Sequence, residues 1–255
     1  MRLKDIPFPK EYGSWGILIT SCLIGIFLPN VVFTIKNLAY ISGISLLFMT
    51  KAPIALLIRR RNKSGLIFTL LYSSLGLFIL IPPLLNVNTR SLFILLLIPL
   101  LTISVYGIFT FLHRERAFTV EFFAMATLSS PILFFYAIYN RNITGDVILV
   151  WLFSFLYFSA SIFKVKMLIF EKSIYRVSNI AYLILLFISL FLLIHFNRAS
   201  WLIYLPFLPL LDNALLTFFH YQERKHLKLV GILELIKGSA FAILLIVITR
   251  TALKF

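Results

Sequence analysis

The feature that most constrains this chain is a succession of long apolar segments separated by short polar connections. Hydrophobic residues make up 61% of the 255 positions and charged residues 13%, against roughly 45–50% and about 25% in an ordinary soluble domain. A soluble fold of this size could not bury so much apolar surface in one core. The composition therefore excludes a soluble globular protein and predicts an integral membrane protein with lipid around its outer face.

The apolar segments have the length of membrane-spanning helices. A helix needs about 20 apolar residues to cross the hydrocarbon core, and the segments are continuous rather than alternating, which favours helices over strands. We therefore predict an all-α polytopic membrane protein with residues 1–255 in a single transmembrane domain. The nine predicted spans are 15–35, 38–58, 66–85, 92–112, 118–139, 147–170, 177–195, 201–219 and 229–248.

The basic residues predict the orientation of these spans, because cytoplasmic loops of membrane proteins collect Lys and Arg. Most of the 24 Lys and Arg fall on one side if the N-terminus is cytoplasmic, and the connection that holds Arg59, Arg60, Arg61 and Lys63 is the most basic. Nine spans then place the C-terminus outside the cell. We expect a multi-pass protein of the inner (plasma) membrane, in which the net charge of +15 reflects topology and no nucleic-acid partner is expected.

Several ionisable residues lie within the spans, all in the predicted cytoplasmic halves. Such a group is costly unless it is paired or faces water, and it is a functional-site hypothesis by default. A lysine can extend to the interface, whereas Asp212 is too short to do so and is therefore the most informative position. The sequence predicts a basic, cytosol-facing cavity lined by Glu11, Lys51, Arg114, Arg116, Glu121, Lys164, Lys166, Asp212, Asn213, Glu234 and Lys237.

The signs of these charges indicate the ligand. Basic groups attract phosphate or carboxylate, with Lys acting as a point charge and Arg as a fork. The residues expected to hold the anion are Lys51, Arg114, Lys164 and Lys166. Asp212 and Glu121 are the candidate catalytic groups, which would orient the lysines or accept a proton. The predicted ligand is a membrane lipid or another anionic, phosphate-bearing molecule; the alternative is an internal salt-bridge network, including an i, i+3 pair between Glu234 and Lys237, that binds nothing.

Searches for metal-dependent or nucleophilic chemistry give no candidate in the sequence. The four histidines have no ligand spacing, and the single cysteine, Cys22, lies in an apolar segment. Ser161 and Lys164 match an S-x-x-K pattern, but the other motifs of that chemistry are absent. We therefore expect neither a metal nor a cofactor.

A weak internal repeat is present. Lys51 and Lys164 are separated by the same number of residues as Glu121 and Glu234, and the segment Phe111-Leu112-His113 has a counterpart in Phe218-Phe219-His220. This pattern predicts two four-helix units, 38–139 and 147–248, after a first helix at 15–35, as in membrane proteins built from parallel repeats.

The segment Pro9-Lys10-Glu11-Tyr12-Gly13-Ser14-Trp15-Gly16 resembles the start of the YwiC-like family of bacterial membrane proteins, in which a basic residue and Glu or Gln precede His-Gly-x-Trp. The resemblance extends along the chain through Arg114-Glu115-Arg116 with Glu121, through Ser161 with Lys164 and Lys166, and through Lys228, Gly231 and Glu234. Tyr12 stands where the family has His, which argues against a proton-transfer role at this position. The resemblance implies a multi-spanning membrane protein and does not imply an activity.

The predicted architecture also resembles the UbiA superfamily of intramembrane prenyltransferases, which have nine helices and a polar cavity open to the cytosol. Their Asp-rich motifs hold Mg²⁺ and a prenyl diphosphate, whereas the corresponding stretches here contain Lys51 with 59–61 and Lys164 with Lys166. Since Mg²⁺ requires carboxylate oxygens, the resemblance implies a metal-independent transferase. A transporter of a small anion and a structural subunit of a membrane complex are the alternatives, and the sequence does not decide whether the protein is an enzyme.

Overall fold

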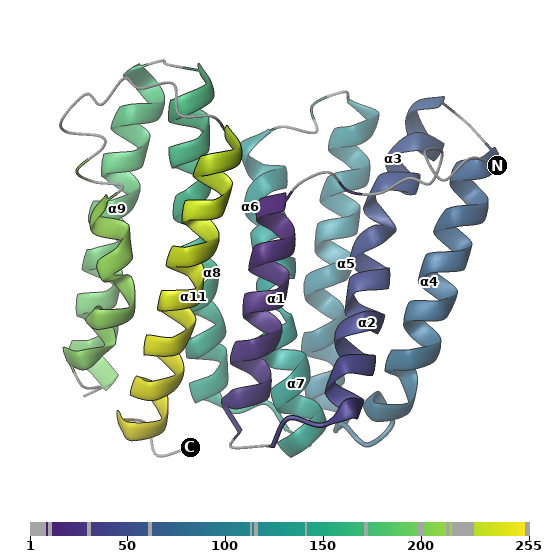
Figure 1. Ribbon diagram of the computed structural model, residues 1–255, viewed down its shortest axis with the longest axis horizontal. Helices are drawn as coiled ribbons and strands as arrows, with labels where there is room; N and C mark the ends of the chain where they lie inside the picture. Colours follow the sequence, from purple (N-terminus) through teal and green to yellow (C-terminus); the bar gives the residue numbers. More distant parts are fainter. Residues whose placement is uncertain are drawn as a thin grey trace.

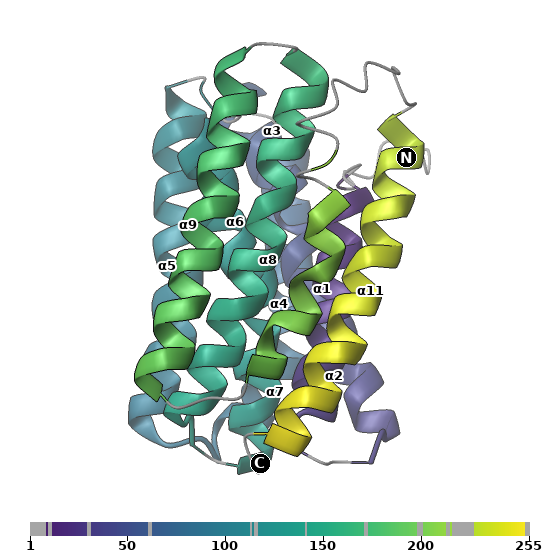
Figure 2. The same cartoon turned by 90° about the vertical axis from the view of Figure 1, so that its left-hand side faces the viewer.

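The computed structural model describes residues 9, 12–29, 32–60, 63–112, 114, 117–140, 142–170, 173–197, 201–212, 215 and 227–252. Figures 1 and 2 show a bundle of helices that stand side by side with nearly parallel axes. Within these described ranges every regular element is a helix and none is a strand. The prediction of an all-α fold is confirmed.

The described residues form a succession of helices. In chain order they are α1 (Tyr12–Phe27), α2 (Ile35–Met49), α3 (Lys51–Arg60), α4 (Lys63–Leu84), α5 (Thr89–Phe111), α6 (Phe118–Ser129), α7 (Pro131–Asn140), α8 (Gly145–Phe170), α9 (Ser173–Asn197), the 3₁₀-helix η2 (Trp201–Leu210) and α11 (Leu227–Ala252).

In the described part of the chain, seven helical segments are long and apolar enough to cross a membrane, which confirms an integral, multi-pass membrane protein. They are Ile35–Ile58, Gly65–Leu84, Thr89–Phe111, Phe118–Asn140, Gly145–Met167, Ile174–Leu192 and Ile232–Thr251. The two other predicted spans, 15–35 and 201–219, contain the shorter apolar helices Gly13–Phe27 and Trp201–Leu210. The count of nine spans, their orientation and the inner membrane stay predictions.

The first predicted span was wrong beyond Phe27, where α1 ends. The Leu28 N–H still donates to the Ile24 carbonyl at 2.9 Å. The next residue, Pro29, has no N–H with which to continue the helical hydrogen bonds. Residues 32–34 are not helical, and α2 begins at Ile35. The 3₁₀ geometry of η2 has a related origin, because its interior contains Pro206 and Pro209.

The second predicted span is divided into α2 and α3 close to Pro53. Pro53 cannot donate to the carbonyl of Met49, and Met49 is the residue at which α2 ends. The hydrogen bond from the Ile54 N–H to the Thr50 carbonyl, 3.0 Å long, restores the pattern directly afterwards.

Helix α1 packs closely against the start of α7, next to the division between α6 and α7. A Cβ atom on Gly25 would lie 2.8 Å from the Pro131 carbonyl oxygen and 2.9 Å from Ile132 Cα. Both atoms belong to the backbone, so α1 can approach this point only because residue 25 is a glycine.

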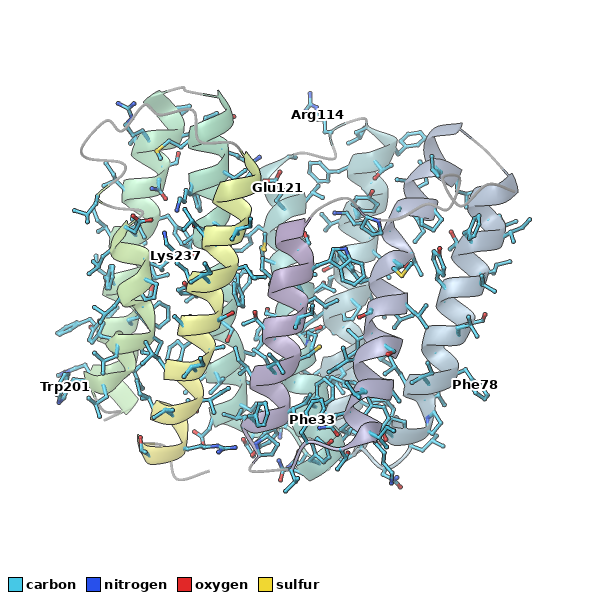
Figure 3. All side chains as sticks on the ribbon, in the orientation of Figure 1. Phe33, Phe78, Arg114, Glu121, Trp201 and Lys237 are labelled. Atoms are coloured by element: carbon cyan, nitrogen blue, oxygen red, sulfur yellow. The ribbon has the colours of Figure 1, made fainter. Side chains whose placement is uncertain are left out.

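The buried core lies where α1, α7, α8, η2 and α11 pack together; its largest members include Phe135, Phe207 and Phe241. Helices α4 and α5 instead expose large apolar side chains, such as Phe78 and Leu100, and Phe78 points away from the bundle in Figure 3. In a membrane these side chains face lipid.

The predicted repeat of 38–139 and 147–248 stays a prediction. The repeat would pair α2 and α3 with α8, and α6 and α7 with α11. The first partner of each pair is interrupted, whereas α8 and α11 are continuous, so the interruptions at Pro53 and Pro131 are not repeated.

Candidate functional site

Four of the predicted site residues come together between α8, the end of η2 and α11. Lys164 Nζ lies 2.6 Å from Glu234 Oε1 and 3.4 Å from Asp212 Oδ2. Lys237 Nζ contacts the same Asp212 Oδ2 and lies 3.8 Å from Glu234 Oε1. We call Lys164, Asp212, Glu234 and Lys237 the ion cluster. It joins three elements that are far apart in the sequence, and Figure 3 shows Lys237 on the side of α11 that faces η2.

The members of the ion cluster differ in exposure. The Lys164 side chain is 4% exposed and the side chains of Glu234 and Lys237 are largely buried, whereas the Asp212 side chain is 48% exposed. Lys164 lies six residues before the end of α8, which places it about 9 Å along the helix from that end. Because an isolated buried ammonium group is costly, the two carboxylates are what allow Lys164 to remain charged.

The charges of the ion cluster balance. Two ammonium groups face two carboxylates, so the four side chains carry no net charge when all are ionised. The excess of lysines from which a basic site was predicted is not found within this cluster. Any anion that binds here must therefore compete with a carboxylate of the protein.

Lys166 takes part in a separate ion pair. Its Nζ lies 3.0 Å from Glu121 Oε2, which connects α8 to the first turn of α6. Lys164 and Lys166 are two residues apart and so point about 200° apart around α8. The structure consequently places the two lysines on different sides of this helix.

The remaining predicted residues are not gathered at the ion cluster. Lys51 begins α3, which packs against α2, α4 and α5 at the other side of the bundle in Figure 1. Arg114 is exposed, and Figure 3 shows it pointing away from the bundle beyond α5. Glu11, Arg116 and Asn213 lie outside the described residues. Among the residues that are described, no group of three or more His, Cys, Asp and Glu is placed to hold a metal ion.

A group of aromatic side chains that the sequence analysis missed lies directly beneath the ion cluster. The rings of Tyr157 and Phe241 are stacked with centroids 3.9 Å apart, and the Phe207 ring lies 5.6 Å from Phe241 and 6.2 Å from Tyr157. We call these three buried residues the aromatic floor. Helical spacing could have identified part of it. Tyr157 precedes Lys164 by two turns of α8, and Phe241 follows Lys237 by one turn of α11.

The direction of the helices sets the position of the aromatic floor. α8 ends, and α11 begins, at the same end of the bundle (Figure 1), so Tyr157 and Phe241 both lie on the side of the cluster that faces the opposite end. Phe207 lies in η2, before Asp212 in the chain, and is on that side of the cluster too. The floor therefore closes the ion cluster toward the end of the bundle that we predict to be external.

The N-terminal motif, Pro9–Gly16, packs against α2 and against α11, the helix that carries Glu234 and Lys237. The Trp15 indole Nε1 donates to the Pro9 carbonyl at 3.2 Å, and the Trp15 ring meets Phe48 of α2 edge-on with centroids 4.9 Å apart. A Cβ atom on Gly16 would lie 2.6 Å from Leu235 Cδ1, and Leu235 is next to Glu234 on α11. This motif thus fixes α1 against both α2 and the helix that supplies two members of the cluster.

Comparison with known proteins identifies the family through the first half of the chain. The model of the family described as YwiC-like protein matches residues 8–139, just over half of the sequence, from the N-terminal motif through α7. No curated protein and no solved structure matches the chain. The ion cluster lies after the matched residues, and the resemblance beyond Tyr139, like the resemblance to UbiA enzymes, stays a prediction. The chain belongs to the YwiC-like family.

Proposed function

We propose that this membrane protein binds an anionic ligand, lipid or phosphate-bearing, at the ion cluster. The observation that supports the proposal is the position of Asp212 Oδ2, which is held by two ammonium groups at once, Lys164 Nζ at 3.4 Å and Lys237 Nζ. An oxygen of a phosphate or carboxylate ligand has the same charge and the same acceptor chemistry. It would therefore replace the Asp212 oxygen between the two lysines.

Asp212 is the carboxylate that gives way in this exchange. Its side chain is half exposed, whereas Glu234 is largely buried and lies closer to Lys164. When Asp212 turns outward, Lys164, Lys237 and Glu234 together carry one positive charge, which a single anionic group neutralises. The proposed site is thus occupied by an internal anion at rest and by an external anion when the ligand is bound.

The aromatic floor favours binding at one end of the bundle over transport across it. A transporter needs a polar route that continues beyond its binding site, whereas Tyr157, Phe207 and Phe241 pack together below the cluster. Such a site suits a receptor for an anionic ligand or a metal-independent transferase acting on one.

A purely structural salt-bridge network is the second candidate, because the charge balance of the ion cluster is what such a network requires. A ligand-binding site and a structural network respond differently when an ion pair is neutralised: the first loses its ligand, and the second has no ligand to lose. Replacing Lys164 and Glu234 together by glutamine removes one positive and one negative charge and keeps the cluster neutral, so the fold is spared the cost of an unpaired buried charge.

Native mass spectrometry of gently extracted protein tests the proposal. Wild-type protein is expected to carry an anionic molecule that the variant with Lys164→Gln and Glu234→Gln loses, while its Tm remains close to that of the wild type. The matched control neutralises the other pair, through Lys166→Gln and Glu121→Gln, and is expected to retain the molecule. A wild-type protein free of anions, or one whose anion survives in both variants, refutes the proposed site.

A further inference from the structure

We infer that the ligand of the ion cluster is a membrane amphiphile with a single anionic head group, which reaches the cluster sideways from the bilayer at Asp212. The inference rests on the proposed function and adds to it the class of the ligand and its route. It is carried by the apolar side chains around the exposed edge of the cluster.

Apolar side chains surround Asp212 along its own segment. Leu208, Leu211 and Leu215 are each about half exposed, and we call them the leucine strip. Leu208 and Leu211 are three residues apart across the end of a 3₁₀-helix, a spacing that places side chains on one side, and Asp212 directly follows Leu211. The half-exposed carboxylate therefore opens beside an apolar surface of the kind that faces lipid.

The exposed edge of the cluster is apolar on α11 as well. Leu233 directly precedes Glu234, and Ile236 directly precedes Lys237; both apolar side chains are substantially exposed. A site for a soluble anion gains from polar and cationic groups around its entrance, whereas the described residues that flank this one on two elements include exposed leucine and isoleucine. The exposed basic residue Arg114 points away from the bundle beyond α5 (Figure 3).

The arrangement fits an amphiphile for an energetic reason. A carboxylate at a lipid-facing surface is costly, and the two lysines reduce that cost by neutralising it. An anionic head group that replaces the carboxylate is neutralised by the same lysines, while its chain lies along the leucine strip. The leucine strip would contact the chains of any lipid. The head group therefore determines which lipid binds, and the chain allows that lipid to reach the cluster from the bilayer.

The test places a fluorescent reporter on the leucine strip of the full chain. The reporter is Leu211→Trp, with Leu208→Trp as a second position, and the matched control is Leu100→Trp on the exposed face of α5. Each variant is reconstituted in zwitterionic phospholipid vesicles with a small fraction of a monoanionic phospholipid with brominated chains, which quench tryptophan on contact. Quenching in wild-type protein, which has 3 Trp, is subtracted.

We expect the brominated anionic lipid to be enriched roughly tenfold at the strip reporters, the fold-change that about 1.4 kcal/mol of head-group contact produces. The control should show no enrichment. Adding Lys237→Gln with Asp212→Asn, which keeps the cluster neutral, should abolish the enrichment. Equal quenching at the strip and at position 100 overturns the inference. Loss of the enrichment in millimolar inorganic phosphate also overturns it, since the ligand is then a soluble anion and the proposed function alone stands.

Discussion

Lys164 on α8 and Glu234 on α11 are 70 residues apart in the chain and form an ion pair with 2.6 Å between Nζ and Oε1. The pair connects two apolar helices that could otherwise slide past each other, since most of their other contacts are non-directional. The Lys164 side chain is almost completely buried, so it depends on carboxylate partners to remain charged. If the proposed function is correct, the same four side chains determine both the stability of the fold and ligand binding.

Removing one member of this ion pair should lower the free energy of unfolding far more than removing both. Lys164→Ala leaves Glu234 without its closest partner, and a broken buried pair costs about 3–5 kcal/mol. The variant with Lys164→Gln and Glu234→Gln should retain most of the stability of the wild type. Thermal unfolding in one detergent checks the ranking, and a single variant as stable as the double variant would show that the pair is not coupled.

Gly25 should tolerate no side chain. In Gly25→Ala the new Cβ meets the backbone of Pro131 and Ile132, which cannot move aside without displacing α7, and overpacking of this kind costs about 1–3 kcal/mol. Gly107→Ala on α5 is the matched control, because no atom lies within 4 Å of its Cβ position, and alanine in a helix interior is favoured over glycine. Opposite shifts of Tm are expected, and a stabilised Gly25→Ala would disprove the close approach.

Trp15 should stabilise the fold through both its ring and its indole N–H. Trp15→Phe keeps an aromatic ring against Phe48 but loses the hydrogen bond to the Pro9 carbonyl, at a cost of about 1 kcal/mol. Trp15→Ala also removes the ring, and truncation of a packed aromatic costs about 3–5 kcal/mol. The free energy of unfolding of both variants is measured in mixed micelles. Equal losses of stability in Trp15→Phe and Trp15→Ala would mean that the ring contributes nothing.

The topology makes a separate prediction. Arg250, near the end of α11, donates from Nε to the carbonyl of Phe27 at 3.0 Å, and Phe27 is the last residue of α1. The two helices consequently run in the same direction and end at the same face of the membrane. A reporter fused after Phe255 should be active outside the cytoplasm and one inserted at 61–62 inside it. The reverse pattern would overturn the predicted orientation.

The sequence alone was sufficient to find the members of the ion cluster, because a charge stands out in an apolar segment. It was not sufficient to predict their partners. Lys164 and Lys166 are two residues apart, yet one meets Glu234 and the other Glu121, and only the packing of α6 and α11 on opposite sides of α8 decides which. The i, i+3 spacing of Glu234 and Lys237 suggested a local pair, which is present at 3.8 Å, and both residues also make closer contacts with other segments.

Helix ends were predicted poorly because the length of the apolar segments was the guide. The second predicted span is divided close to Pro53, and α1 stops before Pro29 even though apolar residues continue beyond it. Within the aromatic floor, Phe207 could not be found from helical spacing, because it lies in a 3₁₀-helix with two prolines, where a spacing of 3.6 residues per turn gives the wrong face.

The affinity of Asp212→Asn for an anionic phospholipid tests the central claim most directly. If Asp212 occupies the place of the ligand's anion, removing its charge leaves the two lysines with Glu234 alone and frees the site from its internal competitor. Titration followed by native mass spectrometry should then show roughly tenfold tighter binding than in the wild type, together with a gain in Tm on adding the lipid. Unchanged or weaker binding would contradict the account.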